Sequence, residues 1–76
     1  MDIKVLGPGC AKCKATADLI TRVAGEAGKT VTIEKIEDMR QIVSYGVMTT
    51  PAVVVGGKVV HKGSVPSHDQ VLGWLG

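Results

Sequence analysis

The chain has 76 residues, carries a formal net charge of +2, and is 45% hydrophobic and 21% charged. This length allows a single domain, and the composition is that of a globular protein, which excludes a disordered tail, a collagen-like chain and a coiled coil. The slight charge and the low aromatic content, 3%, argue against a nucleic-acid partner. No apolar run approaches the roughly 20 residues of a membrane span, and the N-terminal residues lack a signal pattern. We therefore expect a soluble, cytoplasmic protein with no membrane partner.

The first third of the chain predicts a strand followed by a helix. Residues 2–6 are a short apolar run rich in β-forming residues, and the Gly-Pro-Gly turn at 7–9 ends it. From Cys10 the apolar residues recur with a helical period, and Gly28 is a plausible residue to end the helix. The residues expected on its buried face are Cys13, Ala17, Ile20, Val23, Ala24 and Ala27.

The middle of the chain predicts a second strand and a short helix. Residues 30–36 alternate between apolar and polar side chains, as in a half-buried strand. Asp38 is a good N-cap and Gly46 a good C-terminal stop for the helix between them. The side chains expected to fill the core here are Met39, Ile42, Val43 and Met48.

The C-terminal third predicts a hairpin and a last helix. Gly56-Gly57 is a two-residue hairpin signal between Ala52–Val55 and Lys58–Lys62, so these two strands should be antiparallel. Ser67 and Gln70 have the spacing of a capping box, which marks the start of a helix. The side chains that this helix is expected to bury are Val71, Leu72, Trp74 and Leu75.

The predicted order of elements is β-α-β-α-β-β-α, which indicates one α/β domain over residues 1–76. The first strand-helix-strand unit should form a right-handed parallel pair. A mixed four-stranded sheet with helices on both faces follows. The strands at 30–36 and at Lys58–Lys62 carry charged side chains that suit exposed sheet edges. Charged edges favour a monomer.

The sequence Cys10-Ala11-Lys12-Cys13 carries the strongest functional signal. The loop between the cysteines is too short for a disulfide to stabilise the fold, so a redox or metal site is more typical. The pair lies where a strand ends and a helix begins, and the positive end of a helix favours the reactive thiolate. Lys12 adds positive charge between the sulfurs, so Cys10 should ionise more readily than an ordinary thiol. We predict that Lys12→Glu raises the pKa of Cys10; an unchanged thiol titration would refute this.

This spacing suits a two-step exchange of disulfides. Residues three apart on a helix lie roughly 5–6 Å from each other, about the separation that a disulfide spans. Cys13 is on the apolar face of the predicted helix and should be the less exposed of the two. Cys10 would attack a substrate disulfide as the nucleophile, and Cys13 would then displace the substrate as the resolving thiol.

The chain as a whole resembles the thioredoxin fold, and within it the small redox-active disulfide proteins of glutaredoxin size. The resemblance rests on the cysteine pair after the first strand, on Thr50-Pro51 before the hairpin, and on the order of elements. It implies a thiol–disulfide oxidoreductase that reduces protein disulfides as an electron donor without a bound cofactor. A thioredoxin-reductase-like enzyme or another thiol reductase would recharge it. It also implies that Pro51 is cis and shapes a substrate groove, that the Thr50 backbone pairs with the substrate, and that Gly63 keeps the groove open.

A metal-binding module is the alternative function for the same cysteine pair. Two thiolates could bind Zn²⁺ or Cu(I). A closed zinc site needs two further ligands, and His61 and His68 are the only histidines in the chain. The sequence gives neither histidine a geometric relation to the cysteines, so we expect no metal.

Overall fold

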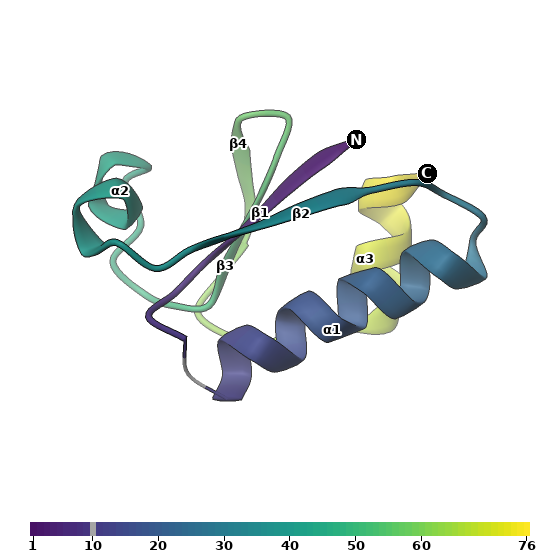
Figure 1. Cartoon of the computed structure of the whole chain (residues 1–76), viewed down its shortest axis with the longest axis horizontal. Helices are drawn as coiled ribbons and strands as arrows, with labels where there is room; N and C mark the ends of the chain where they lie inside the picture. Colours follow the sequence, from purple (N-terminus) through teal and green to yellow (C-terminus); the bar gives the residue numbers. More distant parts are fainter. Residues whose placement is uncertain (10) are drawn as a thin grey trace.

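The computed structural model describes residues 1–9 and 11–76 as a mixed four-stranded sheet with three helices (Figure 1). The strands are β1 (Asp2–Leu6), β2 (Thr32–Ile36), β3 (Ala52–Val55) and β4 (Lys58–Lys62), and the helices are α1 (Ala11–Glu26), α2 (Met39–Ser44) and α3 (His68–Leu75). The strand order is β2-β1-β3-β4, with β1 parallel to β2 and antiparallel to β3, and β3 antiparallel to β4. The predicted α/β fold class and sheet are confirmed.

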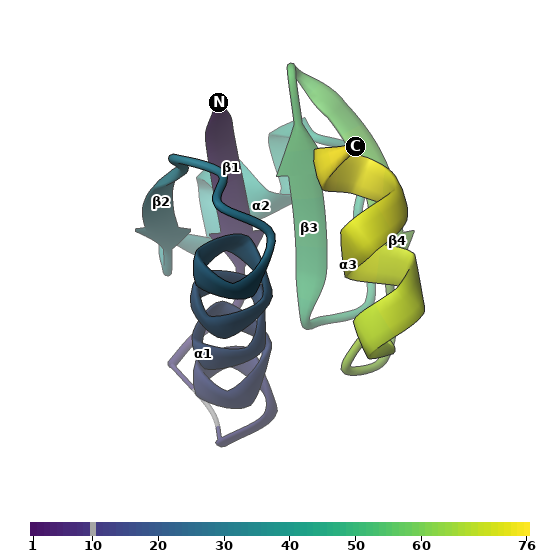
Figure 2. The ribbon, with the colours of Figure 1, turned by 90° about the vertical axis from the view of Figure 1, so that its right-hand side faces the viewer.

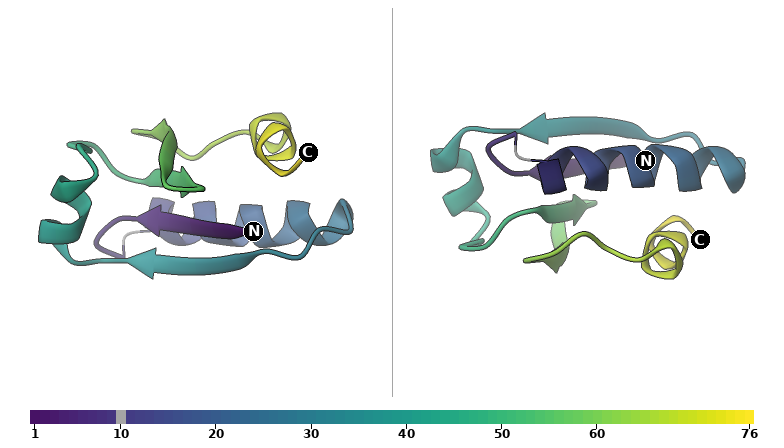
Figure 3. Two further views of the ribbon diagram at one scale, coloured as in Figure 1. Left: turned by 90° about the horizontal axis from the view of Figure 1, so that it is seen from above. Right: turned by 90° about the horizontal axis from the view of Figure 1, so that it is seen from below.

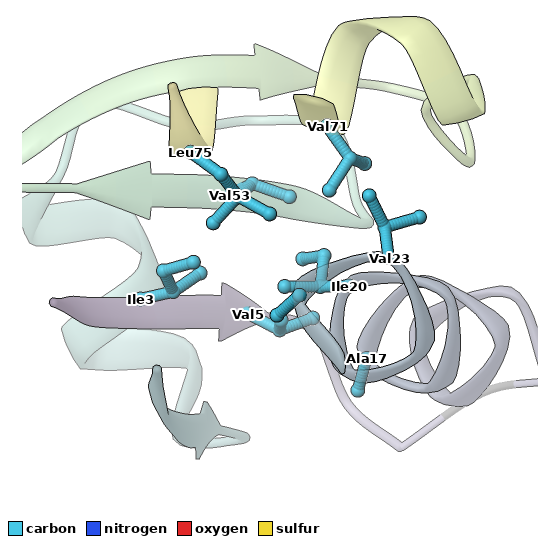
Figure 4. Packing of buried hydrophobic residues seen from close by; sticks show 9 residues of the cluster. Ile3, Val5, Ala17, Ile20, Val23, Val53, Val71 and Leu75 are labelled. Atoms are coloured by element: carbon cyan, nitrogen blue, oxygen red, sulfur yellow. The ribbon is translucent and has the colours of Figure 1, made fainter. Parts of the chain in front are cut away.

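One face of the sheet is covered by α1 and α3, which lie in front of the strands in Figure 2. Side chains of β1 and β3 pack there against the apolar faces of both helices (Figure 4). The buried members of this first core are Ile3, Val5, Ala17, Ile20, Val23, Ala24, Val53, Val71 and Leu75. Each fully buried Val, Leu or Ile stabilises the fold by about 1.5–3 kcal/mol, so this core fixes the position of α1 and of the residues at its start.

The opposite face is covered only at one end, by α2. Figure 3 shows this helix at the end of the sheet toward which β1 and β2 run. The second core there consists of Leu6, Ile36, Ile42, Val47, Ala52 and Val54. The rest of the face is open and holds a hollow of about 500 Å³ whose lining includes Lys4, Thr32 and Glu34.

Lys4 stands on this open face and is tied to the residue that ends α2. Its Nζ donates a hydrogen bond to the Tyr45 hydroxyl at 3.3 Å. This hydrogen bond is the main cause that raises the pKa of Lys4 above its usual 10.5, followed by the charges of ionised Tyr45 and of Glu34. The contact joins β1 to the C-terminal end of α2.

Short-range signals set most of the element boundaries. Asp38 accepts a hydrogen bond from the Arg40 backbone and caps α2, and Ser67 and Gln70 form the predicted capping box of α3. Both glycines of the hairpin have positive φ, 59° at Gly56 and 82° at Gly57, as a two-residue turn of this type requires. These predictions are confirmed.

Several predicted core positions are wrong. Ala27 is exposed because α1 ends one residue earlier, at Glu26, and Leu72 is 38% exposed because α3 buries only Val71 and Leu75 fully. The second strand begins at Thr32, two residues after its predicted start. Trp74 is half-buried, and its ring lies 6.0 Å from that of His61 between centroids.

The surface of α2 differs most from the prediction. Only Ile42 of this six-residue helix is buried, whereas Met39 is 56% and Val43 61% exposed. Met48, expected to fill the core, is 94% exposed. A helix this short, lying on the end of a sheet, presents a single position to the core.

In the part of the chain that is described, no helix has the length and apolar character to cross a membrane.

Candidate active site at the turn between β1 and α1

Cys13 lies in the first turn of α1 with only 5% of its surface exposed. The turn before it is anchored to the sheet, because the Gly7 backbone N–H donates to the Ile36 carbonyl at 2.9 Å. Gly7 is itself buried, and a Cβ on it would overlap the Cys13 sulfur and lie 3.2 Å from the Cys13 Cβ. The sulfur therefore occupies the space that the absent side chain of Gly7 leaves.

A second segment, the one before β3, meets the same turn. The Thr50 side chain lies 3.7 Å from the position of a Cβ on Gly7. The Thr50–Pro51 peptide bond is cis, as predicted, and Pro51 is buried. Thr50 and Cys13 are therefore neighbours across Gly7, although 37 positions separate them in the sequence.

Gly63 adjoins this segment from the end of β4. Its backbone N–H donates to the Pro51 carbonyl at 2.9 Å. Its φ is +87°, and a Cβ there would lie 3.4 Å from the Thr49 hydroxyl oxygen. The structure thus brings Cys13, Thr50, Pro51 and Gly63, which the sequence analysis had selected separately, to one end of the sheet.

Two other predicted site residues, Cys10 and Lys12, are not shown to be part of this arrangement. Cys10 lies outside the described residues. Lys12 is exposed on α1, and its backbone carbonyl accepts a hydrogen bond from the Thr16 hydroxyl at 2.8 Å. The effect of Lys12 on the ionisation of Cys10 stays a prediction.

The whole chain, residues 1–76, matches the thioredoxin-domain family model. The chain belongs to the thioredoxin family. It is 30% identical over 69 residues to a thioredoxin of Methanocaldococcus jannaschii, a match that covers 91% of this chain and 79% of that protein. It is 31% identical over 71 residues to a thioredoxin of Methanothermobacter thermautotrophicus, covering 93% and 92% respectively. Family membership establishes thiol–disulfide oxidoreductase activity.

Beside Cys13, this thioredoxin-family protein has a charged hollow that the sequence analysis missed. The hollow has a volume of about 230 Å³, and its wall includes Gly9, Cys13, Lys14, Lys35 and Glu37. The parallel register of β1 and β2 pairs Leu6 with Ile36, so the residues that follow each strand emerge side by side. The parallel pairing of these two strands was predicted from the sequence, but that prediction did not identify which side chains line the hollow beside Cys13.

An apolar groove lies on the α2 side of the same turn. Its volume is about 400 Å³, and Pro8, Met39, Val43, Met48 and Thr50 contribute to its wall. Pro8 belongs to the turn before the cysteines. The Thr50 side chain lies near the Cβ position of Gly7, where the Cys13 sulfur packs. The groove therefore runs directly up to the candidate site.

The histidines considered as metal ligands have other partners. His61 Nε2 lies 3.1 Å from the Ser64 hydroxyl, and His68 Nε2 lies 2.9 Å from a carboxylate oxygen of Glu26. Within residues 1–9 and 11–76, no group of three or more His, Cys, Asp and Glu side chains is arranged to hold a metal ion. The geometry of the histidines gives no support to a closed zinc site.

Proposed function

We propose that this thioredoxin-family protein reduces disulfide bonds in other proteins through Cys10 and Cys13. The observation that carries the proposal is the placement of the Cys13 sulfur, buried against Gly7 and next to the segment of Thr50 and Pro51. A buried sulfur three residues after the proposed nucleophile suits a resolving thiol. The spacing of three positions between Cys10 and Cys13 in the sequence suits an intramolecular disulfide.

The proposed reaction moves two electrons from the protein to the substrate. The Cys10 thiolate attacks one sulfur of the substrate disulfide, which forms a mixed disulfide and releases the first substrate thiolate. The Cys13 thiolate then attacks the Cys10 sulfur, which forms the Cys10–Cys13 disulfide and releases the second substrate thiolate. Each released thiolate takes up one proton. A thioredoxin-reductase-like enzyme or another thiol reductase returns the two electrons, so no bound cofactor is needed.

The surroundings of Cys13 support a substrate groove. Thr50 is only partly buried next to Cys13, which suits backbone pairing between Thr50 and an extended segment of the substrate. Pro51 would form the floor of the groove. Gly63, linked to Pro51 by a hydrogen bond, would leave the far side of the groove uncrowded.

A protein substrate is favoured over a small one by the apolar groove on α2. Soluble chains rarely place several large apolar side chains together on a surface unless the surface has a partner. Met39, Val43 and Met48 are each more than half exposed and surround a groove that reaches the site. A chain that carries the target disulfide could cover them. We expect such a reductant to work in the cytoplasm, where thiols are kept reduced.

Trapping the intermediate tests the proposal. We expect Cys13→Ser to accumulate a mixed disulfide with an oxidised protein substrate, because the second attack cannot occur. Cys10→Ser should form no such adduct at a comparable rate. Mass spectrometry of the intact adduct reads out both results. If both variants behaved alike, or if the purified protein carried stoichiometric metal on its thiols, the proposal would be wrong.

A further inference from the structure

The apolar groove on the α2 side of the candidate site contains two of the three methionines of the chain. Met39 lies at the start of α2 and is 56% exposed, and Met48 lies two residues before Thr50 and is 94% exposed. Methionine is one of the residues most often buried in proteins, so two such side chains on one surface are unusual. In the described wall of the groove, their thioethers are the groups that a peroxide can oxidise.

The chain around both methionines holds them outside the core. Val47, the residue before Met48, is 2% exposed and belongs to the second core, and Pro51, three residues after Met48, is buried. Met48 projects into solvent from the short stretch between these two anchors. Met39 belongs to α2, whose buried residue is Ile42. Oxidation of either sulfur would therefore change the surface of the groove and leave both cores untouched.

Met1 provides an internal comparison, because its exposure, 53%, is close to that of Met39 but it lies at the other end of the sheet. Its backbone carbonyl accepts a hydrogen bond from the Thr32 N–H at 2.9 Å, where β2 begins. The groove adjoins the end toward which β1 and β2 run and at which α2 lies (Figure 3). A peroxide should reach all three sulfurs, but only those of Met39 and Met48 can alter the groove.

We propose that Met39 and Met48 form a site of reversible oxidation, at which a peroxide turns the apolar groove polar and weakens the docking of protein substrates. The inference rests on the proposed function, in which a protein substrate covers the groove. With hydrogen peroxide, the thioether sulfur attacks one peroxide oxygen, an S–O bond forms, the O–O bond breaks, and the other oxygen leaves as water with both protons. The sulfur loses the two electrons that the peroxide gains. Methionine sulfoxide reductases reverse the change.

The sulfoxide would act through the cost of burying a polar group. A thioether is apolar and polarisable and suits contact with an apolar partner, whereas the sulfoxide oxygen is polar and accepts hydrogen bonds from water. A partner that covers this oxygen must remove the water, and an apolar surface supplies no donor in return. The cysteine exchange uses neither sulfur, because Cys13 lies on α1 against Gly7. Oxidation should therefore slow the attack on protein disulfides and spare small disulfides that leave the groove uncovered.

The test compares each protein with its own oxidised form. The cysteines are first converted to the Cys10–Cys13 disulfide, which protects them, and hydrogen peroxide is added until the mass of the intact chain shows one added oxygen per methionine. Dithiothreitol then reduces the disulfide, leaves the sulfoxides and is removed. The proteins are the wild type and Met39→Leu/Met48→Leu, which keeps Met1 as its sole methionine. Leucine matches methionine in size and apolar character but has no sulfur to oxidise.

Two disulfides are offered to the reduced proteins, insulin as a protein and 2,2′-dithiodipyridine as a small molecule. Acid quenching and the mass of the intact chain report the loss of two hydrogens from the cysteine pair. We expect oxidation of the wild type to slow the reaction with insulin about tenfold and the reaction with the small disulfide less than about twofold. The oxidised double variant should stay within about twofold of its own unoxidised form with both disulfides.

Reversal and stability complete the expected result. Treatment of the oxidised wild type with methionine sulfoxide reductases of both stereospecificities should restore its reaction with insulin. Oxidation should shift the midpoint of thermal unfolding by less than about 4 °C, as expected of a change confined to exposed side chains.

Three results would overturn the inference while leaving the proposed function intact. One is an oxidised wild type that reduces insulin as fast as the unoxidised protein. Another is a double variant that loses as much rate on oxidation as the wild type, which would place the effect outside Met39 and Met48. The third is an equal slowing with both disulfides, which would indicate damage to the exchange site. An unoxidised wild type that transfers no electrons to insulin would instead overturn the proposed function, and the inference with it.

Discussion

Replacing Gly7 with alanine should destabilise the fold and disturb the candidate site, because the new methyl group would occupy the space of the Cys13 sulfur. Gly7 does not have a positive φ, so alanine can adopt its backbone conformation and the effect is one of packing. Overpacking a core costs about 1–3 kcal/mol, and the severe overlap here favours the upper half of that range. Alanine in place of glycine returns about 0.5–1 kcal/mol through the unfolded chain. A net loss of about 1–2.5 kcal/mol remains.

Gly25→Ala is the matched control for this substitution. Gly25 is near the end of α1, and a Cβ there would have no heavy atom within 4 Å. The same chemical change should therefore stabilise the protein by about 0.5–1 kcal/mol, since glycine is unfavourable in a helix. The two variants should shift the free energy of unfolding in opposite directions.

Urea denaturation of the reduced proteins measures both effects, and thermal unfolding should show a drop of roughly 5–15 °C for Gly7→Ala. The double variant Gly7→Ala/Cys13→Ala tests the cause, because it removes the overlapping sulfur. More than half of the destabilisation by Gly7→Ala should disappear in that background. If Gly7→Ala were as stable as Gly25→Ala, the described packing of Cys13 against this turn would be wrong.

Three further predictions concern other parts of the molecule. Met48→Lys should leave stability within about 0.5 kcal/mol of the wild type but raise the KM for a protein disulfide, with no effect on a small disulfide; equal effects on both substrates would contradict a docking role. Ser67→Ala should cost about 1 kcal/mol in urea denaturation through loss of the α3 cap, with exchange activity retained. Tyr45→Phe should lower the pKa of Lys4 toward 10.5, as measured by NMR titration. Because the wild-type pKa is raised, the stabilisation from this contact is present below 10.5 and is lost as the pH rises through the raised value, so the two proteins should converge in stability there.

The elements of the fold could be predicted because each is marked by residues close together in the chain. The glycine pair at 56–57 specifies its turn, and the Ser67–Gln70 spacing specifies the start of α3. The apolar period of α1 likewise identified Ile20 and Val23 as core residues, because a long helix repeats its pattern over several turns.

The exposed face of α2 could not be predicted in the same way. With six residues, the helix is too short for periodicity to show which apolar positions face the core. Met39 and Val43 follow the pattern of buried residues, yet only Ile42 meets the sheet. Apolar side chains that are exposed although the fold does not require it are naturally explained by a binding surface.

Glu37 was missed for a different reason. Nothing in the residues around it distinguishes it from the neighbouring acids Glu34 and Asp38. Its place beside Cys13 depends on the pairing of β1 with β2 and on the path of the turn at Gly9. Only the three-dimensional arrangement brings the carboxylate and the thiol to one hollow.

The reduction potential of the cysteine pair is the measurement that tests the central claim most directly. The protein is equilibrated with dithiol buffers of graded potential, and the mass of the intact chain reports the loss of two hydrogens on oxidation. The account predicts one reversible Cys10–Cys13 disulfide with a potential near about −270 mV, as expected of a cytoplasmic reductant. A potential near about −120 mV would contradict the proposed direction of electron flow, and no reversible two-hydrogen change at any potential would contradict the exchange mechanism itself.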